Sequence, residues 1–166
     1  AHAETDGTVF ETLGVVAAGI LDTSVGVVDQ AVGRRPALVK GHVSSDKPTM
    51  VRMHQTSLFA DIFGEEGPRS GLLARSMAMI GEEGSGVVVL INKPEPDSYS
   101  RTIRARTEGL SKVIQTAEEL RDYGVGAQIL ADLGVHDMIL LTNTRHNLIA
   151  LDGYDLSVVE ERAITG

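Results

Sequence analysis

The chain has 166 residues, a hydrophobic fraction of 42% and a formal net charge of −8 at pH 7. That length suits one domain with its own core, and the acidic balance argues against a nucleic-acid surface, which needs clustered Lys and Arg. The sequence has no apolar run long enough to cross a bilayer and no signal-peptide pattern, so we expect no membrane partner. Cysteine is absent, which rules out disulfides and thiolate metal sites and fits a cytoplasmic protein.

The first residues and the strands that follow them predict an antiparallel start. Residues 1–7 are small and polar, and we expect a flexible terminus or a linker remnant. Because the chain does not begin with Met, we expect a processed form or a fragment of a longer protein. Residues 9–21 and 25–28 favour two antiparallel strands joined by the polar turn 22–24, although the periodicity of the first also permits a helix.

The remaining elements alternate between strands and helices. In chain order we expect a break at 33–36, a strand at 37–43, a turn at 44–48, a strand at 49–54, a loop at 64–71, a helix at 72–80 ended by 81–86, a strand at 87–91, a short helix at 99–107, a helix from 118 to Gly134, a strand at 138–141, a short helix at 147–151 and a final strand at 156–162. This order predicts an α/β domain over residues 8–166, with a mixed sheet, antiparallel N-terminal strands and flanking helices.

The segment after residue 118 carries a resemblance to a known family. Its residues are Leu120-Arg121-Asp122-Tyr123-Gly124-Val125-Gly126-Ala127-Gln128-Ile129-Leu130, then Asp132-Leu133-Gly134-Val135 and Leu140-Leu141-Thr142-Asn143. They resemble GTP cyclohydrolase II, and the likeness can be followed from about residue 37 to the C-terminus. That family opens the riboflavin pathway, often as the C-terminal half of a fusion with 3,4-dihydroxy-2-butanone 4-phosphate synthase. The resemblance implies the family's fold, a homodimer and a synthase domain ahead of this one.

The zinc site of the family has no counterpart in this sequence. The family holds zinc with three cysteines, and the metal activates the water that opens the imidazole ring of GTP. The resemblance places those cysteines at Ser57, Pro68 and Ser70. Proline has no ligand atom and a serine hydroxyl is a poor substitute for a thiolate. We therefore expect no zinc and no other cofactor, with magnesium present only if GTP binds.

The phosphate site of the family is also altered. Its Glu-Gly-Arg segment corresponds to Glu95, Pro96 and Asp97 here, so the glycine and the arginine are replaced. A carboxylate beside a phosphate is repulsive, by on the order of 1 kcal/mol at a partly screened site. The family's lysine falls at Asn147, and its tyrosine falls at about Arg106.

Four residues are the ones that we expect to line any remaining nucleotide pocket: Arg52, His54, Glu95 and Thr142. All four stand at or after the end of a predicted strand, where ligands of α/β folds usually bind. Each would also be an ordinary residue for a strand end.

Arg121 and Glu119 are the candidate catalytic residues that the resemblance implies. Arg121 matches the arginine proposed as the family's nucleophile toward the α-phosphate, and Glu119 stands where the family has an aspartate. The alternative is that Arg121 and its neighbours only cap and pack the helix. A second basic group, Arg101, Arg104 and Arg106, either binds an anion or forms a solvated face.

Two functions from different classes remain open. The first is a GTP-cyclohydrolase-II-like domain of riboflavin biosynthesis that has lost its zinc ligands and its ring-opening activity, and is retained for a structural, dimerising or regulatory role. The alternative is a zinc-independent enzyme that acts on GTP or a related nucleotide phosphate through Arg121 and Glu119. An active cyclohydrolase is least favoured, because unbound water has a pKa of about 15.7, against about 7 on zinc.

Overall fold

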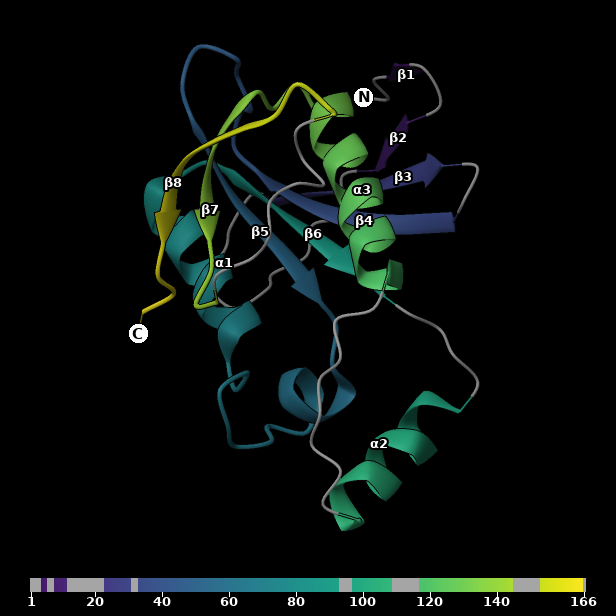
Figure 1. The fold of residues 1–166 in the computed structure, drawn as a ribbon. Helices are drawn as coiled ribbons and strands as arrows, with labels where there is room; N and C mark the ends of the chain where they lie inside the picture. Colours follow the sequence, from purple (N-terminus) through teal and green to yellow (C-terminus); the bar gives the residue numbers. More distant parts are fainter. Residues whose placement is uncertain are drawn as a thin grey trace.

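The computed structural model describes residues 4–5, 8–11, 23–30, 33–92, 97–108, 117–144 and 153–165. Its strands form one sheet in the order β1-β2-β3-β4-β6-β5-β7-β8 (Figure 1). The strands are β1 (Glu4–Thr5), β2 (Thr8–Glu11), β3 (Thr23–Gln30), β4 (Gly33–Lys40), β5 (Thr49–Gln55), β6 (Gly86–Ile91), β7 (Asp137–Leu141) and β8 (Ser157–Arg162). The helices are the π-helical turn η1 (Leu58–Ile62), α1 (Leu72–Glu83), α2 (Ser98–Thr107) and α3 (Ala117–Asp132).

The N-terminal part of the sheet is antiparallel, as the sequence predicted. β1 pairs with β2, β2 with β3, β3 with β4 and β4 with β6, all antiparallel. The expected break at 33–36 is wrong, because β4 already begins at Gly33. Pro36 is tolerated there because β4 pairs with β6 only from Ala37 onward, so the side of β4 that faces β6 is not yet paired at Pro36. The expected turn at 22–24 is wrong in part, since β3 begins at Thr23.

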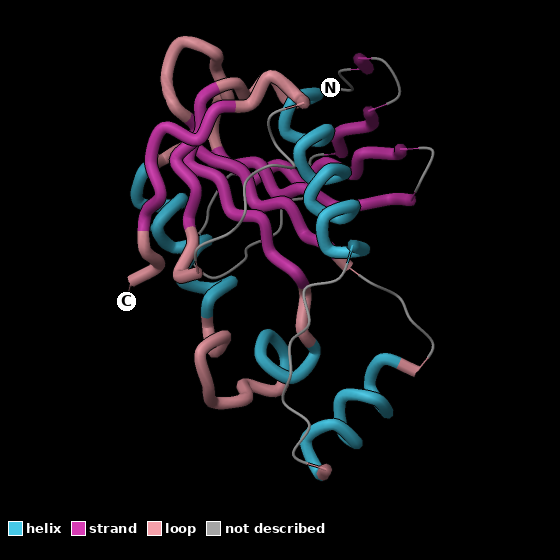
Figure 2. The backbone as a smooth tube through the Cα atoms, in the orientation of Figure 1, coloured by secondary structure: helices cyan, strands magenta, loops and turns pink. Residues whose placement is uncertain are grey.

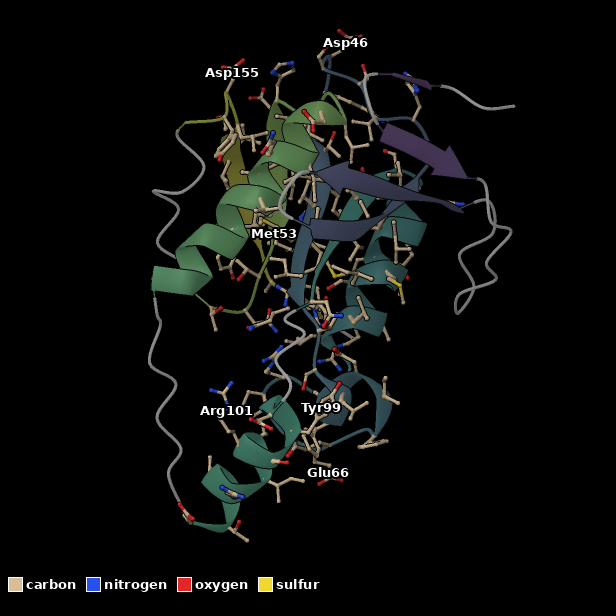
Figure 3. All side chains as sticks on the ribbon, turned by 90° about the vertical axis from the view of Figure 1, so that its right-hand side faces the viewer. Asp46, Met53, Glu66, Tyr99, Arg101 and Asp155 are labelled. Atoms are coloured by element: carbon tan, nitrogen blue, oxygen red, sulfur yellow. The ribbon has the colours of Figure 1, made fainter. Side chains whose placement is uncertain are left out.

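The C-terminal part of the sheet is parallel and is built by helical crossovers. β5 pairs in parallel with β6 and with β7, and β7 pairs in parallel with β8. Parallel neighbours need a crossover connection, and here α1 joins β5 to β6 while α2 and α3 lie between β6 and β7. Figure 3 shows α1 and α3 on opposite faces of the sheet.

The two faces of the sheet bury two apolar clusters. Alternate residues of β5 point to opposite faces, so Val51 and Met53 pack with the α3 residues Ala127 and Leu130. Met50 of the same strand packs on the other face, in a cluster with α1. These faces confirm the α/β class and its flanking helices.

Several element ends differ from the sequence prediction. The strand expected at 37–43 ends at Lys40, before Gly41 with a positive φ of 65°. The helix expected at 72–80, with its end within 81–86, runs to Glu83 and ends at Gly84, whose φ of 83° favours glycine. The loop expected at 64–71 is present, but η1 before it was not predicted. The expected helix at 147–151 lies outside the described residues.

Two segments lie beyond the carboxyl ends of the parallel strands. Figure 2 shows η1 and α2 outside the sheet, at the end toward which β5 and β6 run. In the part of the chain that the structure describes, no helix is long and apolar enough to span a bilayer. The sheet therefore presents one edge of strand ends next to η1 and α2.

Two glycines give opposite predictions for the stability of this fold. A Cβ at Gly86 would lie 2.6 Å from the carbonyl oxygen of Met50 and 2.9 Å from Cγ2 of Ile80, so Gly86→Ala should lower the free energy of unfolding by about 1–3 kcal/mol. Gly124→Ala is the matched control, because its Cβ would meet only the Tyr154 hydroxyl, at 3.6 Å. Because Gly124 lies inside α3, Gly124→Ala should raise the free energy of unfolding by about 0.5–1 kcal/mol. Urea unfolding of both variants tests this, and equal effects would contradict it.

Candidate functional site

The candidate site lies where the parallel strands end. Because β5, β6 and β7 are parallel, their carboxyl ends meet at one edge of the sheet, where ligands of α/β folds bind. β5 brings Arg52 and His54 to this edge, and Thr142 follows β7 directly. α3 runs back from this edge toward the start of β7, so its first turns, which carry Glu119 and Arg121, begin there (Figure 1). The side chains of Glu119 and Arg121 and the whole of Glu95 lie outside the described residues.

Arg52 links β5 to the end of β7. Its Nη1 donates a hydrogen bond of 2.9 Å to the carbonyl oxygen of Leu141. Burial lowers the pKa of Arg52 from its ordinary value, and the nearby Arg69 lowers it further, whereas Tyr123 and Asp61 oppose both. A guanidinium has no accessible neutral form in a protein, so Arg52 brings a positive charge to the site.

His54 and Asp61 form a buried pair. His54 is 1% exposed, and its Nε2 lies 2.9 Å from Oδ2 of Asp61. The same carboxylate oxygen accepts the backbone N–H of Ser57 at 2.7 Å. Since a carboxylate accepts, Nε2 carries the ring proton. Burial lowers the pKa of His54 from 6.5, against the hydrogen bond to Asp61, so the histidine is neutral at pH 7.

Three atoms of this cluster have unused hydrogen-bonding capacity. Among the side chains that the structure describes, the buried polar atoms without a hydrogen-bond partner are Nε of Arg52, Nδ1 of His54 and Oδ1 of Asp61. Buried polar groups nearly always have partners, and exceptions mark functional sites or bound solvent. Two side chains from β5 and one from η1 therefore form a polar site suited to a small polar ligand.

Thr142 does not point its hydroxyl group into this cluster. Its Oγ1 donates to the carbonyl oxygen of Thr144 at 2.8 Å and accepts the backbone N–H of the same residue at 3.2 Å. The hydroxyl thus closes a local turn after β7. Of the expected pocket residues, Arg52 and His54 are brought together, and Thr142 stands beside them with its side chain engaged.

The loop after β5 is closed by hydrogen bonds between protein groups. Oγ of Ser57 accepts the backbone N–H of Ala60 at 3.3 Å and caps η1. Arg69 reaches back and donates to the carbonyl oxygen of Gln55, and Arg75 donates to that of Ser70 at 2.8 Å. These contacts tie the loop from both ends.

A metal ion has no ligand set in this loop. The three positions where the resembled family has cysteine are Ser57, whose hydroxyl caps η1, Pro68, which has no ligand atom, and Ser70. Within the described ranges, no group of three or more His, Cys, Asp or Glu side chains could hold a metal ion. The residues present therefore do not fit zinc.

Sequence reasoning missed two residues of the site, Asp61 and Arg69. Asp61 meets His54 only because η1 turns the chain back within seven residues, and a π-helical turn has no simple sequence signature. Arg69 lies in a loop whose path decides its partner. The signal that was available is the position of both residues inside the segment that should hold the metal.

Comparison with known proteins finds a matching family and several relatives. The sequence model of a family described as GTP cyclohydrolase II matches residues 28–163. Riboflavin biosynthesis protein RibBA of Bacillus cereus is 38% identical in an alignment of 137 residues that covers 75% of this chain and 34% of RibBA. RibBA of Bacillus cytotoxicus gives the same values. The chain therefore spans about a third of the length of these relatives.

A solved structure shares the fold. The crystal structure of RibBX, a two-domain 3,4-dihydroxy-2-butanone 4-phosphate synthase from A. baumannii, matches with a TM-score of 0.56 and 22% identity. The match covers 100% of this chain and 40% of that chain. At 22% identity the match shows a shared fold only, and it confirms the predicted α/β fold class.

Loss of Arg69 should loosen the loop after β5. Arg69→Ala removes the hydrogen bond to Gln55, and a lost charge-assisted hydrogen bond should speed local opening about three- to tenfold. Limited digestion with a protease that cuts after glutamate would report this at Glu65 and Glu66. Arg162→Ala, which removes an arginine of β8 paired with Glu160, is the control. Unchanged cleavage in Arg69→Ala would refute the role of this contact.

The buried histidine should make stability depend on pH. Since the pKa of His54 is lowered in the folded state, the unfolded chain binds more protons below pH 6.5, and stability falls as the pH drops through that value. Urea unfolding at about pH 7.5 and about pH 5.5 should show a smaller loss in His54→Gln than in the wild type. His136→Gln alters a half-exposed histidine and should keep the wild-type loss. Equal losses in all three proteins would count against a neutral, buried His54.

Proposed function

The chain belongs to the GTP cyclohydrolase II family, and we propose that it is a member that has lost zinc and the opening of the GTP ring. In this proposal it is one domain over residues 8–166, acts in the cytoplasm, and serves riboflavin biosynthesis in a structural, dimerising or regulatory role. The observation that carries the proposal is the loop after β5, where two of the three metal-ligand positions make hydrogen bonds to protein groups: Ser57 caps η1 and the carbonyl oxygen of Ser70 accepts from Arg75.

The chemistry of ring opening explains why this loop matters. Attack of water on the imidazole ring needs a nucleophile far stronger than free water, and zinc supplies it by lowering the pKa of water from about 15.7 to about 7. His54 is a neutral base within the site, whose Nε2–H donates to Asp61 and whose basic Nδ1 has no partner. A general base contributes about 10²–10⁴-fold, which falls short of what metal activation provides.

The remaining polar cluster supports retained binding of a ligand rather than turnover. Arg52 supplies a positive charge, and His54 and Asp61 supply further hydrogen-bonding atoms at the same strand end. We propose these residues, with Thr142 and Glu95, as the vestige of the nucleotide pocket, with magnesium accompanying any bound triphosphate. The acid at position 97, where the family has arginine, should weaken that binding.

A partner domain fits the length of the relatives. The RibBA proteins are about three times longer than the matched segment, and RibBX is named as a two-domain synthase. We propose that this domain works beside a 3,4-dihydroxy-2-butanone 4-phosphate synthase domain and forms a homodimer. The sheet and its helices would then serve for support, which needs packing and no metal.

A zinc-independent enzyme is the second candidate. Glu119 and Arg121 lie in the first turns of α3, at the edge of the sheet where Arg52 stands. An arginine that attacks the α-phosphate of GTP or a related nucleotide would release pyrophosphate and leave the ring closed. The position of these two residues on α3 favours this reading; their match to the family motif is its other support.

Incubation with GTP, magnesium and zinc separates these candidates. We expect neither formate nor pyrophosphate from the purified chain, because the residues that the structure describes include no set that would hold a metal to activate water for the ring. Pyrophosphate without formate, abolished in Arg121→Ala, would favour the second candidate. Formate would overturn the proposal.

A variant with the three cysteines restored tests whether zinc alone was lost. In Ser57→Cys/Pro68→Cys/Ser70→Cys we expect zinc to bind but formate still to be absent, since the phosphate segment is also altered. Formate from this triple variant would show that the metal ligands were the only loss. Metal content measured on the same sample confirms that the site was rebuilt.

A further inference from the structure

An exposed apolar face lies on η1 and α2. Six large apolar side chains of the described residues are more than a third exposed, and four of them are here: Ile62 at 71%, Phe63 at 67%, Tyr99 at 55% and Ile103 at 53%. We call these four residues the η1–α2 face. Figure 2 shows both segments beyond the sheet, so the face belongs to neither of the apolar clusters of the core.

The four side chains lie on two segments that aromatic contacts join into one apolar strip. The ring of Phe59 meets that of Phe63 edge-on at 6.0 Å and that of Tyr99 edge-on at 6.5 Å, so it joins η1 to α2. Ile103 lies one helical turn after Tyr99, on the same side of α2. Contiguous apolar surface of this kind marks an interaction site on a soluble protein.

The strip is bordered by charges of opposite sign on its two segments. α2 contributes Arg104 and the loop after η1 contributes Glu66, and both residues are exposed. Figure 3 shows Tyr99, Arg101 and Glu66 in the same part of the molecule, below the sheet. One surface therefore carries an apolar centre, a basic edge and an acidic edge.

We propose that the η1–α2 face binds a second copy of this chain about a two-fold axis. A two-fold interface joins the same patch on both subunits, so the patch must complement itself. Here the basic edge of one copy meets the acidic edge of the other while the apolar strips pack at the centre. A membrane or an acidic partner would match only the basic edge, and a basic partner only the acidic edge. The inference rests on the dimerising role proposed above and names its surface.

The interface would act on the polar site through η1. Asp61 points inward from η1 and holds His54, whereas Ile62 and Phe63, the next residues, are exposed in the η1–α2 face. A partner packed on Ile62 and Phe63 restrains the same turn that places the Asp61 carboxylate. Dimerisation therefore restrains the position of Asp61 in the polar site, although the second copy adds no residue to that site.

Sedimentation of the 166-residue chain over a concentration series tests the proposal. The wild type should be a dimer, and Phe63→Glu should raise its dissociation constant by at least about 30-fold, as loss of a central interface side chain does. Val159→Glu is the control, because Val159 is 50% exposed on β8, away from this face, and should leave the dimer intact. Unchanged circular dichroism and melting temperature show that both variants fold.

Charge reversal identifies which edges meet. Glu66→Arg and Arg104→Glu should each weaken the dimer, because each places like charges across the two-fold axis. An equimolar mixture of the two variants should restore it as a heterodimer, in which both contacts are again opposite in sign. A mixture no stronger than its components would overturn the proposed pairing.

The outcomes separate this inference from the proposed function. A wild-type chain that stays monomeric, or a dimer that Phe63→Glu leaves intact, overturns the proposed interface. If the chain is monomeric alone and the face is covered only in a longer protein, the face belongs to a contact with the adjoining domain. Formate release overturns the proposed function whatever the oligomeric state. Neither result depends on the other.

Discussion

Two polar side chains, the half-buried Arg52 and the buried His54, lie at the end of the central parallel strand, and each has a hydrogen-bond partner from another segment. Burying such groups is costly unless they are hydrogen-bonded. Leu141 of the neighbouring strand accepts from Arg52, and Asp61 accepts from His54. The second contact requires the chain to turn back directly after β5, which is what η1 does. The site, the loop and the exposed face beyond it all depend on that turn.

The loop after β5 is therefore a structural element in its own right. Ser57 caps η1 and donates its backbone N–H to Asp61, and Arg69 holds the other end of the loop to Gln55. A metal ion would supply the same restraint through a few ligands. In the function that we propose, hydrogen bonds have taken over the restraint, whereas the activation of water has no substitute. In this proposal the fold is therefore retained although the ring-opening activity is lost.

The two sides of η1 connect the polar site to the surface. Its inward residue, Asp61, is nearly buried beside His54, and its outward residues, Ile62 and Phe63, are exposed next to α2. A short turn with few contacts opens more readily than the core, so an apolar partner on its outer side would change the order of its inner side. In the function that we propose, assembly could in this way change the order of the polar site without any turnover.

The sequence by itself determined what depends on neighbours along the chain. The helical spacing of apolar residues predicted α3, and a continuous apolar run predicted β7. Polar residues predicted the turn at 44–48, and the resemblance identified the family and the fold. Side-chain periodicity is a local property, so these features needed no partner. Only the tertiary structure decided that Arg52 meets Leu141, 89 residues away, that Asp61 meets His54, and that Pro36 continues a strand. These depend on sheet register and on the path of a π-helical turn, which no local pattern encodes.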